Sequence, residues 1–127
     1  MSLNDVLGIK LEADFCEHPG WRKVFSGIDD PLQKIAGLGL KTVEFSLRPG
    51  FREEEVLLLL DRCLKHGLKM NLHPYTGGEH NPACFEDKEG NVARETGRCF
   101  LEIAHRAGQI QGRRTGLILH GASTADL

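Results

Sequence analysis

The 127-residue sequence has no Cys-x-x-Cys pair, one tryptophan, one tyrosine, and no hydrophobic run longer than the five residues Val56–Leu60. A bilayer-spanning helix takes about 20 apolar residues, so the sequence predicts no membrane span. The N-terminus carries acids where a signal peptide needs an apolar core, and we therefore expect a cytoplasmic protein. The four cysteines lie far apart, and in that compartment we expect free thiols.

An excess of charge of one sign is also lacking. The chain has 16 basic and 18 acidic residues, which gives a formal net charge of −2. This balance gives no reason to expect nucleic acid or an anionic membrane as a partner. The composition is that of a globular protein, with 40% hydrophobic and 27% charged residues. At this length we expect a single domain over residues 1–127.

Strand-like and helix-like patterns alternate along the chain. Residues 6–15 alternate apolar and polar side chains, and three further short strands are expected at Lys41–Ser46, Lys69–His73 and Gly116–His120. The stretches between them carry apolar residues at helical spacing. Because parallel strands need a long crossover connection, this alternation predicts an α/β domain with parallel strands in β-α-β-α-β-α-β order.

Local signals predict where the helices begin and end. Asp29 or Asp30 is expected to cap the first helix. Gly39 and Gly67 follow the first and second helices at matching positions of an internal echo, and Gly67 predicts a left-handed helix end. Gly108 is the expected end of the third helix.

Polar residues fall at the ends of the predicted strands. His73 ends the third strand, His120 ends the fourth, and Glu44 lies near the end of the second. The carboxyl ends of parallel strands share one sheet edge, so we expect these three side chains to gather there. Imidazole suits Zn²⁺, Mn²⁺ or Co²⁺, which makes His73 and His120 candidate metal ligands and Glu44 a candidate third. In the alternative interpretation, both histidines only form hydrogen bonds at strand ends.

Two more residues complete the candidate substrate pocket. Tyr75 follows the third strand, where it would hydrogen-bond a substrate hydroxyl or plug the pocket mouth. Glu12 ends the first strand and is a pocket-lining candidate.

Two other groups of residues are assigned to the core and to the surface. Cys63 occupies an apolar helix position and is expected in the core. Arg106, Arg113 and Arg114 are interpreted as a solvated basic patch on the helical side of the sheet.

At KTVEF, KMNLHPY and GLILHG the sequence resembles the N-terminal half of the xylose isomerase-like TIM barrel superfamily. That superfamily includes sugar and sugar-phosphate isomerases and epimerases and the AP endonucleases of family 2. The resemblance covers most of residues 6–121 and depends on Gly39–Glu44, His73–Tyr75 and His120 in this order. A closed (βα)₈ barrel needs about 250 residues, so we expect half of a (βα)₈ TIM barrel.

The resemblance implies a divalent metal, Zn, Mn, Mg or Co, at the carboxyl ends of the strands. In the endonuclease branch, the positions of His73 and His120 are zinc ligands. In the isomerase branch, residues of these strands line a sugar pocket, and the main metal ligands and bases come from later strands that this chain does not contain.

The implied function is metal-dependent proton transfer next to the carbonyl of a sugar or sugar phosphate, incomplete in this chain alone. The alternatives are a metal-dependent endonuclease of the abasic-site type and a non-catalytic half-barrel. An open half-barrel exposes strand edges, so we also expect self-association through those edges.

Overall fold

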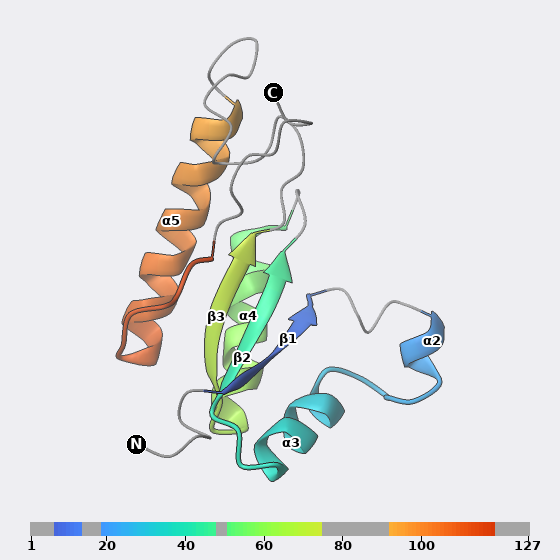
Figure 1. The fold of residues 1–127 in the computed structure, drawn as a ribbon. Coiled ribbons are helices and arrows are strands. Elements are labelled where there is room, and N and C mark those ends of the chain that lie inside the picture. Colours follow the sequence, from blue (N-terminus) through green and yellow to red (C-terminus); the bar gives the residue numbers. More distant parts are fainter. Residues whose placement is uncertain (1–6, 14–18, 48–50, 75–91, 119–127) are drawn as a thin grey trace.

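The computed structural model describes residues 7–13, 19–47, 51–74 and 92–118. β1, β2 and β3 form one parallel sheet in that order, which confirms the predicted α/β class for the described residues. None of the described helices is long and apolar enough to span a membrane. The elements are β1 (Gly8–Glu12), α2 (Pro19–Arg22), α3 (Asp29–Gly37), β2 (Thr42–Leu47), α4 (Glu53–Lys65), β3 (Lys69–Pro74) and α5 (Val92–Gln111) (Figure 1).

A further segment joins the sheet beside β3. Leu117 forms a parallel bridge with Leu72. The Leu72 amide donates to the Gly116 carbonyl at 2.8 Å, and the Ile118 amide donates to the Leu72 carbonyl at 2.9 Å. The predicted fourth strand is therefore present as one bridge, and its last two residues, 119 and 120, lie outside the described part of the chain.

Alternation along the strands gives the sheet two different faces. The apolar face packs against the helices, and Figure 1 shows α4 running behind the sheet. Its strand residues Val43, Phe45, Leu47, Met70 and Leu72 are fully buried. The helices add Leu32, Ile35, Val56, Leu60, Cys63, Phe100, Ile103 and Ala107 to the same core. The opposite face, called the polar face below, carries Lys10, Thr42, Glu44, Ser46, Asn71 and His73.

Cys63 lies in this core, as predicted. Burial raises the pKa of its thiol to about 12, because the thiolate would be poorly solvated there. The side chain is therefore a small hydrophobic packing group of α4 rather than a nucleophile.

The prediction that Asp29 or Asp30 caps α3 was wrong. The N-cap residue is Ile28, and no side chain caps this helix end. Both aspartates lie inside the first turn, where a carboxylate is stabilised by the positive end of the helix dipole. The Asp30 carboxylate accepts hydrogen bonds from the Ser26 amide and hydroxyl at 2.9 and 2.7 Å. It therefore binds the loop that precedes α3 instead of capping the helix.

The prediction that Gly108 ends α5 was also wrong. The helix continues to Gln111, and Gly112 then takes a positive φ of 67°. A Cβ at Gly108 would lie 2.9 Å from the Arg113 carbonyl oxygen, so this glycine lets the returning chain pass close to the helix. The predicted left-handed position of Gly67 after α4 is confirmed by its φ of 70°.

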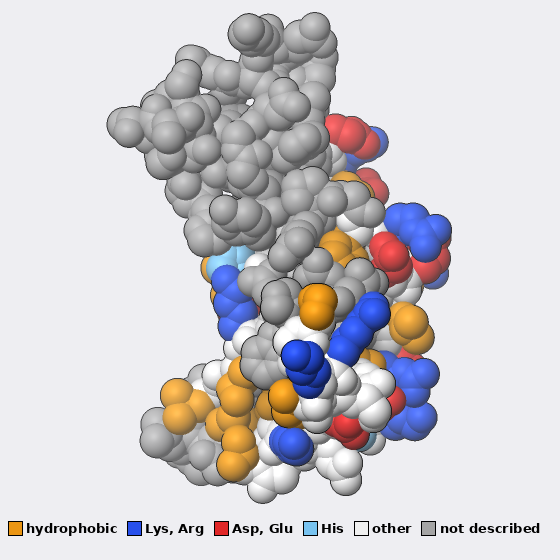
Figure 2. Space-filling view, turned by 90° about the vertical axis from the view of Figure 1, so that its right-hand side faces the viewer, with side chains coloured by type: hydrophobic (Ala, Val, Ile, Leu, Met, Phe, Trp, Pro, Cys, Tyr) orange, Lys and Arg blue, Asp and Glu red, His pale blue; other side chains and the backbone are white. Residues whose placement is uncertain are grey.

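Surface charges of the described residues are mixed in sign. On the face seen in Figure 2, basic and acidic side chains are interspersed along one side and form no continuous basic stripe. Part of this mixing comes from direct ion pairs. Arg106 meets Glu53 at 2.8 Å, and Arg98 meets Glu95 at 2.8 Å.

Candidate functional site

Glu44 and His73 meet on the polar face. His73 Nδ1 lies 2.6 Å from Glu44 Oε1, a short hydrogen bond between an imidazole and a carboxylate. The two side chains are 9% and 22% exposed, so the contact is largely shielded from solvent. Two of the three side chains that the sequence placed together are therefore in contact.

The contact runs diagonally across the sheet. Glu44 is in register with Asn71, and Ser46 is in register with His73. Glu44 is thus the third of six residues in β2 and lies mid-strand, not near the end of the strand as predicted. Glu44 lies two residues before Ser46, the register partner of His73, so its carboxylate reaches toward the carboxyl end of the sheet to meet the imidazole.

The hydrogen bond shows which ring nitrogen of His73 carries a proton toward Glu44. A carboxylate only accepts, so His73 donates from Nδ1, and a neutral ring with this proton has its lone pair on Nε2. The same pairing orients histidines that ligate metals or act as general bases in other proteins. Glu44 therefore fixes the orientation and tautomer of His73.

The other predicted site residues cannot be placed around this pair. Tyr75 and His120 lie outside the described residues, and so does the side chain of Glu12, whose backbone is in register with Ser46. Convergence of His73 and His120 on one metal ion stays a prediction. Within the described part of the chain, no three His, Cys, Asp or Glu side chains are arranged to hold a metal ion.

A cavity of about 230 Å³ lies against Glu44 on the polar face. Lys10, Glu44 and Asn71 line it and are register partners, so an amine, a carboxylate and a carboxamide form one row across the three strands. Such a row offers both donors and acceptors to the hydroxyls of a small polar molecule. Lys10 and Asn71 were not among the predicted site residues, although strand alternation places both on the face of Glu44.

The Asn71 side chain is held by hydrogen bonds from the segment that follows α5 and lies beside β3. Its Oδ1 accepts from the Gly116 amide at 3.0 Å and from Arg113 Nη2 at 3.2 Å. A Cβ at position 116 would lie 2.9 Å from the same oxygen, so any other residue there would displace the Asn71 carboxamide. The cavity wall is therefore fixed by hydrogen bonds before any ligand binds.

The interpretation of three arginines as one solvated patch was wrong for Arg113. Its Nη2 also contacts the Met70 carbonyl oxygen at 3.3 Å, and burial lowers the pKa of the guanidinium. Arg106 pairs separately with Glu53, and Arg114 is exposed. The sequence shows the three charges but not which of them finds a partner on the sheet.

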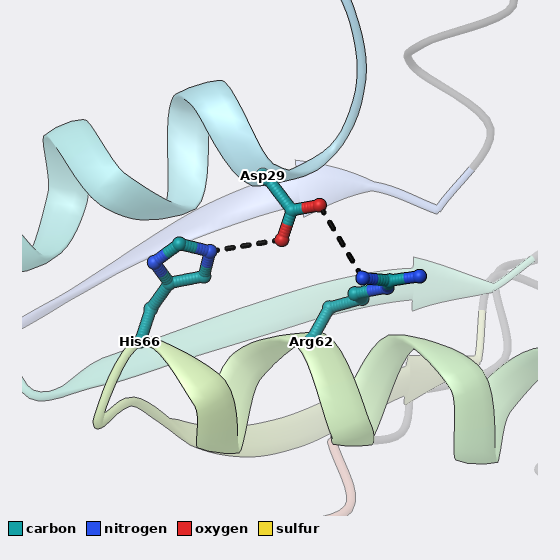
Figure 3. Close-up of polar contacts among 3 residues, drawn as sticks. All are labelled: Asp29, Arg62 and His66. Carbon is teal, nitrogen blue, oxygen red and sulfur yellow. Dashed lines mark hydrogen bonds and ion pairs between the residues drawn. The ribbon is translucent and has the colours of Figure 1, made fainter.

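A second imidazole–carboxylate pair lies in the helical layer (Figure 3). His66 Nε2 is 2.9 Å from Asp29 Oδ1, and Arg62 Nη1 is 3.6 Å from Asp29 Oδ2. The hydrogen bond from His66 is the main cause that lowers the pKa of Asp29, and the Arg62 charge lowers it further. Asp29 is in the first turn of α3 and His66 follows the last turn of α4, so this pair ties two helix ends together.

No protein-family model matches the chain, and no curated protein sequence matches it. The interpretation of Glu44 and His73 therefore depends on their geometry alone.

Proposed function

We propose that the chain forms half of a (βα)₈ barrel of the xylose isomerase-like kind. We further propose that its polar face binds a sugar or sugar phosphate for proton transfer next to a carbonyl. The observation that carries this proposal is the 2.6 Å hydrogen bond between Glu44 and His73, together with a cavity that is lined by Glu44. His73 is the next-to-last residue of β3, and parallel α/β sheets bind their ligands at this end of the strands.

Four residues of the polar face have a role in this proposal. His73, held by Glu44, orients a substrate hydroxyl. Lys10 and Asn71 bind further oxygen atoms of the substrate, and the ammonium group of Lys10 favours a phosphate or carboxylate. The bases that move the proton are expected on strands of the other half of the barrel, and none of the residues named here is assigned that step.

The donors fit a divalent ion in chemical type. His73 supplies an imidazole, and His120 is expected to supply the second, with Glu44 orienting His73 from behind. When bound, such an ion would polarise the substrate carbonyl. Tyr75 and Glu12 are expected at the same pocket, Tyr75 as a hydrogen-bonding partner of a hydroxyl and Glu12 as a lining residue.

The test compares the two imidazole–carboxylate pairs. The full chain is titrated calorimetrically with Zn²⁺, with Mn²⁺ and with a set of aldose and ketose phosphates. Wild type is compared with His73→Gln, Glu44→Gln and the matched control His66→Gln. A hydrogen bond to a charged group is worth about 1.5–3 kcal/mol, so the first two variants should bind roughly 10- to 100-fold more weakly.

The control variant His66→Gln should bind as wild type does, because His66 lies in the helical layer. Circular dichroism checks that each variant is folded. Equal binding by folded His73→Gln and His66→Gln would exclude His73 from the site. Absence of binding in the wild type would contradict the proposal for this chain.

A second candidate is a non-catalytic half-barrel that self-associates, and the edge of the sheet favours it. Among the described residues, β1 pairs with β2 only. At β3, by contrast, the Gln111 carboxamide accepts from the Met70 amide at 2.8 Å and donates to the Met70 carbonyl at 3.2 Å. The β1 edge is therefore where a second copy would add. A monomer mass by light scattering at micromolar concentration would contradict self-association.

A further inference from the structure

A larger cavity, of about 600 Å³, lies between α5 and the chain that returns from α5 to the sheet. Leu101, Ala104 and Leu117 supply apolar lining, and Arg113 and Arg114 supply charged lining. The cavity shares no lining residue with the one beside Glu44. It is therefore a separate candidate site, and its volume is within the usual range of roughly 300–1,000 Å³ for ligand pockets.

Within the described part of the chain, the positive charge of this lining has no acidic partner. None of the lining residues is Asp or Glu. The hydrogen bonds of Arg113 go to neutral oxygens, namely the carbonyls of Met70 and Arg114 and the side chain of Asn71. No ion pair among the described residues includes Arg113 or Arg114.

The guanidinium of Arg113 is also incompletely satisfied. Its Nε is buried and has no hydrogen-bond partner among the described residues. A half-buried cation that meets only neutral acceptors pays for desolvation without compensation from an opposite charge. An anion in the adjoining cavity would supply that charge through space, whether or not Nε turns toward it.

We propose that this cavity binds a small amphipathic anion, a carboxylate or phosphomonoester attached to a hydrocarbon body. The anionic group lies against Arg113 and Arg114, since guanidinium groups recognise both head groups. The hydrocarbon covers Leu101, which is 61% exposed, together with Ala104 and Leu117. The combination of cationic and apolar lining selects a ligand with both parts over a free anion or a neutral hydrocarbon.

Ligand comparisons test both parts of this proposal. The full chain is titrated with octanoate and with octyl phosphate. Octan-1-ol keeps the tail without the charge, and acetate and inorganic phosphate keep the charge without the tail. We expect octanoate or octyl phosphate to bind at least about tenfold more tightly than any of these three. Comparison of the two amphiphiles identifies the preferred head group.

Three outcomes of these titrations would overturn the proposal. Octan-1-ol binding as tightly as both amphiphiles would show that the cavity is only apolar surface. Acetate or inorganic phosphate binding equally well would show an adventitious ion only. Failure of both amphiphiles to bind at millimolar concentration would show that no such site exists.

Variants locate the site on the chain. Arg113→Gln and Arg114→Gln should weaken binding of the preferred amphiphile roughly 10- to 100-fold. The matched control is Arg106→Gln, which makes the same charge change on α5, outside the cavity lining and paired with Glu53. It should leave binding unchanged.

A further variant keeps the test valid if Arg113→Gln fails to fold, because that side chain holds Met70 and Asn71. Leu101→Ser changes an exposed apolar residue of the lining, and it should weaken binding several-fold through the lost apolar contact. If Arg114→Gln and Leu101→Ser both bind as Arg106→Gln does, the cavity is not the binding site.

Discussion

Glu44–His73 and Asp29–His66 join the same two chemical groups at 2.6 and 2.9 Å. Their surroundings differ. The histidine and carboxylate of the first pair are 9% and 22% exposed on the polar face, and those of the second are 20% and 49% exposed between two helix ends. The distance between the groups therefore says little about their role, and what surrounds each pair says more.

The helix ends account for the second pair completely. A carboxylate in the first turn of α3 and an imidazole after the last turn of α4 each match the local helix dipole. Glu44 and His73, by contrast, belong to strands β2 and β3 and not to the ends of described helices. Apolar side chains at these positions would avoid the desolvation cost of a buried carboxylate and imidazole. The proposed ligand would account for a polar row beside a cavity, which stability alone does not require.

The largest change in the free energy of unfolding is expected at Phe45, which neighbours Glu44 in β2 but lies on the opposite face of the sheet. Phe45 is fully buried on the apolar face, and Phe45→Ala should lower the free energy of unfolding by about 3–5 kcal/mol. Glu44→Gln keeps an acceptor for His73 and should lower it by about 1 kcal/mol or less. Urea unfolding measures both changes. An equal loss for the two variants would make Glu44 a structural residue and remove the contrast between the pairs.

The sequence is sufficient to predict which face Glu44 and His73 share. Strand alternation has a period of two, and it places a residue on one face or the other without any knowledge of its neighbours. The same rule would have found Lys10 and Asn71. Their row with Glu44 depends also on register, which is set by the loops and helices that connect the strands.

The errors concern residues with competing roles. Gly108 is a residue type that often ends a helix, but Gly112 is the glycine that ends α5. Gly108 instead allows the backbone at Arg113 to pass close to the helix. Asp29 has the signal of an N-cap, but its carboxylate is bound by His66, which is 37 residues later in the chain. Local signals name the candidates for each role, and tertiary contacts decide between them.

A medium effect is expected from double-mutant cycles that compare the two pairs directly. For Glu44→Gln with His73→Gln, the coupling energy should be up to about 1 kcal/mol, because the contact is short and shielded. For Asp29→Asn with His66→Gln, it should be smaller, because the carboxylate is exposed and solvent screens the pair. Urea unfolding of the single and double variants gives both values. Equal couplings would show that burial does not distinguish the two pairs.

The smallest effect concerns the dependence of stability on pH. The pKa of Asp29 is lowered in the folded chain, chiefly by the hydrogen bond from His66. Its contribution to stability is therefore complete above the ordinary aspartate pKa of about 3.9 and is lost as the pH falls through the lowered folded value. Asp29→Asn should consequently lose less stability than wild type in acid unfolding as the pH falls below about 4.

Added salt distinguishes two causes of the lowered Asp29 pKa, which are nearby positive charge and hydrogen bonding. At about 1 M NaCl the Asp29→Asn difference should shrink, because exposed charges are screened. Asp30→Asn is the matched control: the pKa of Asp30 is lowered mainly by the Ser26 amide and hydroxyl, which are neutral donors, so its difference should persist. An Asp29→Asn difference that salt leaves unchanged would mean that hydrogen bonding, and not the charges around Asp29, lowers its pKa. The contrast with Glu44–His73 would then depend on burial alone, and the helix dipoles would no longer explain the exposed pair.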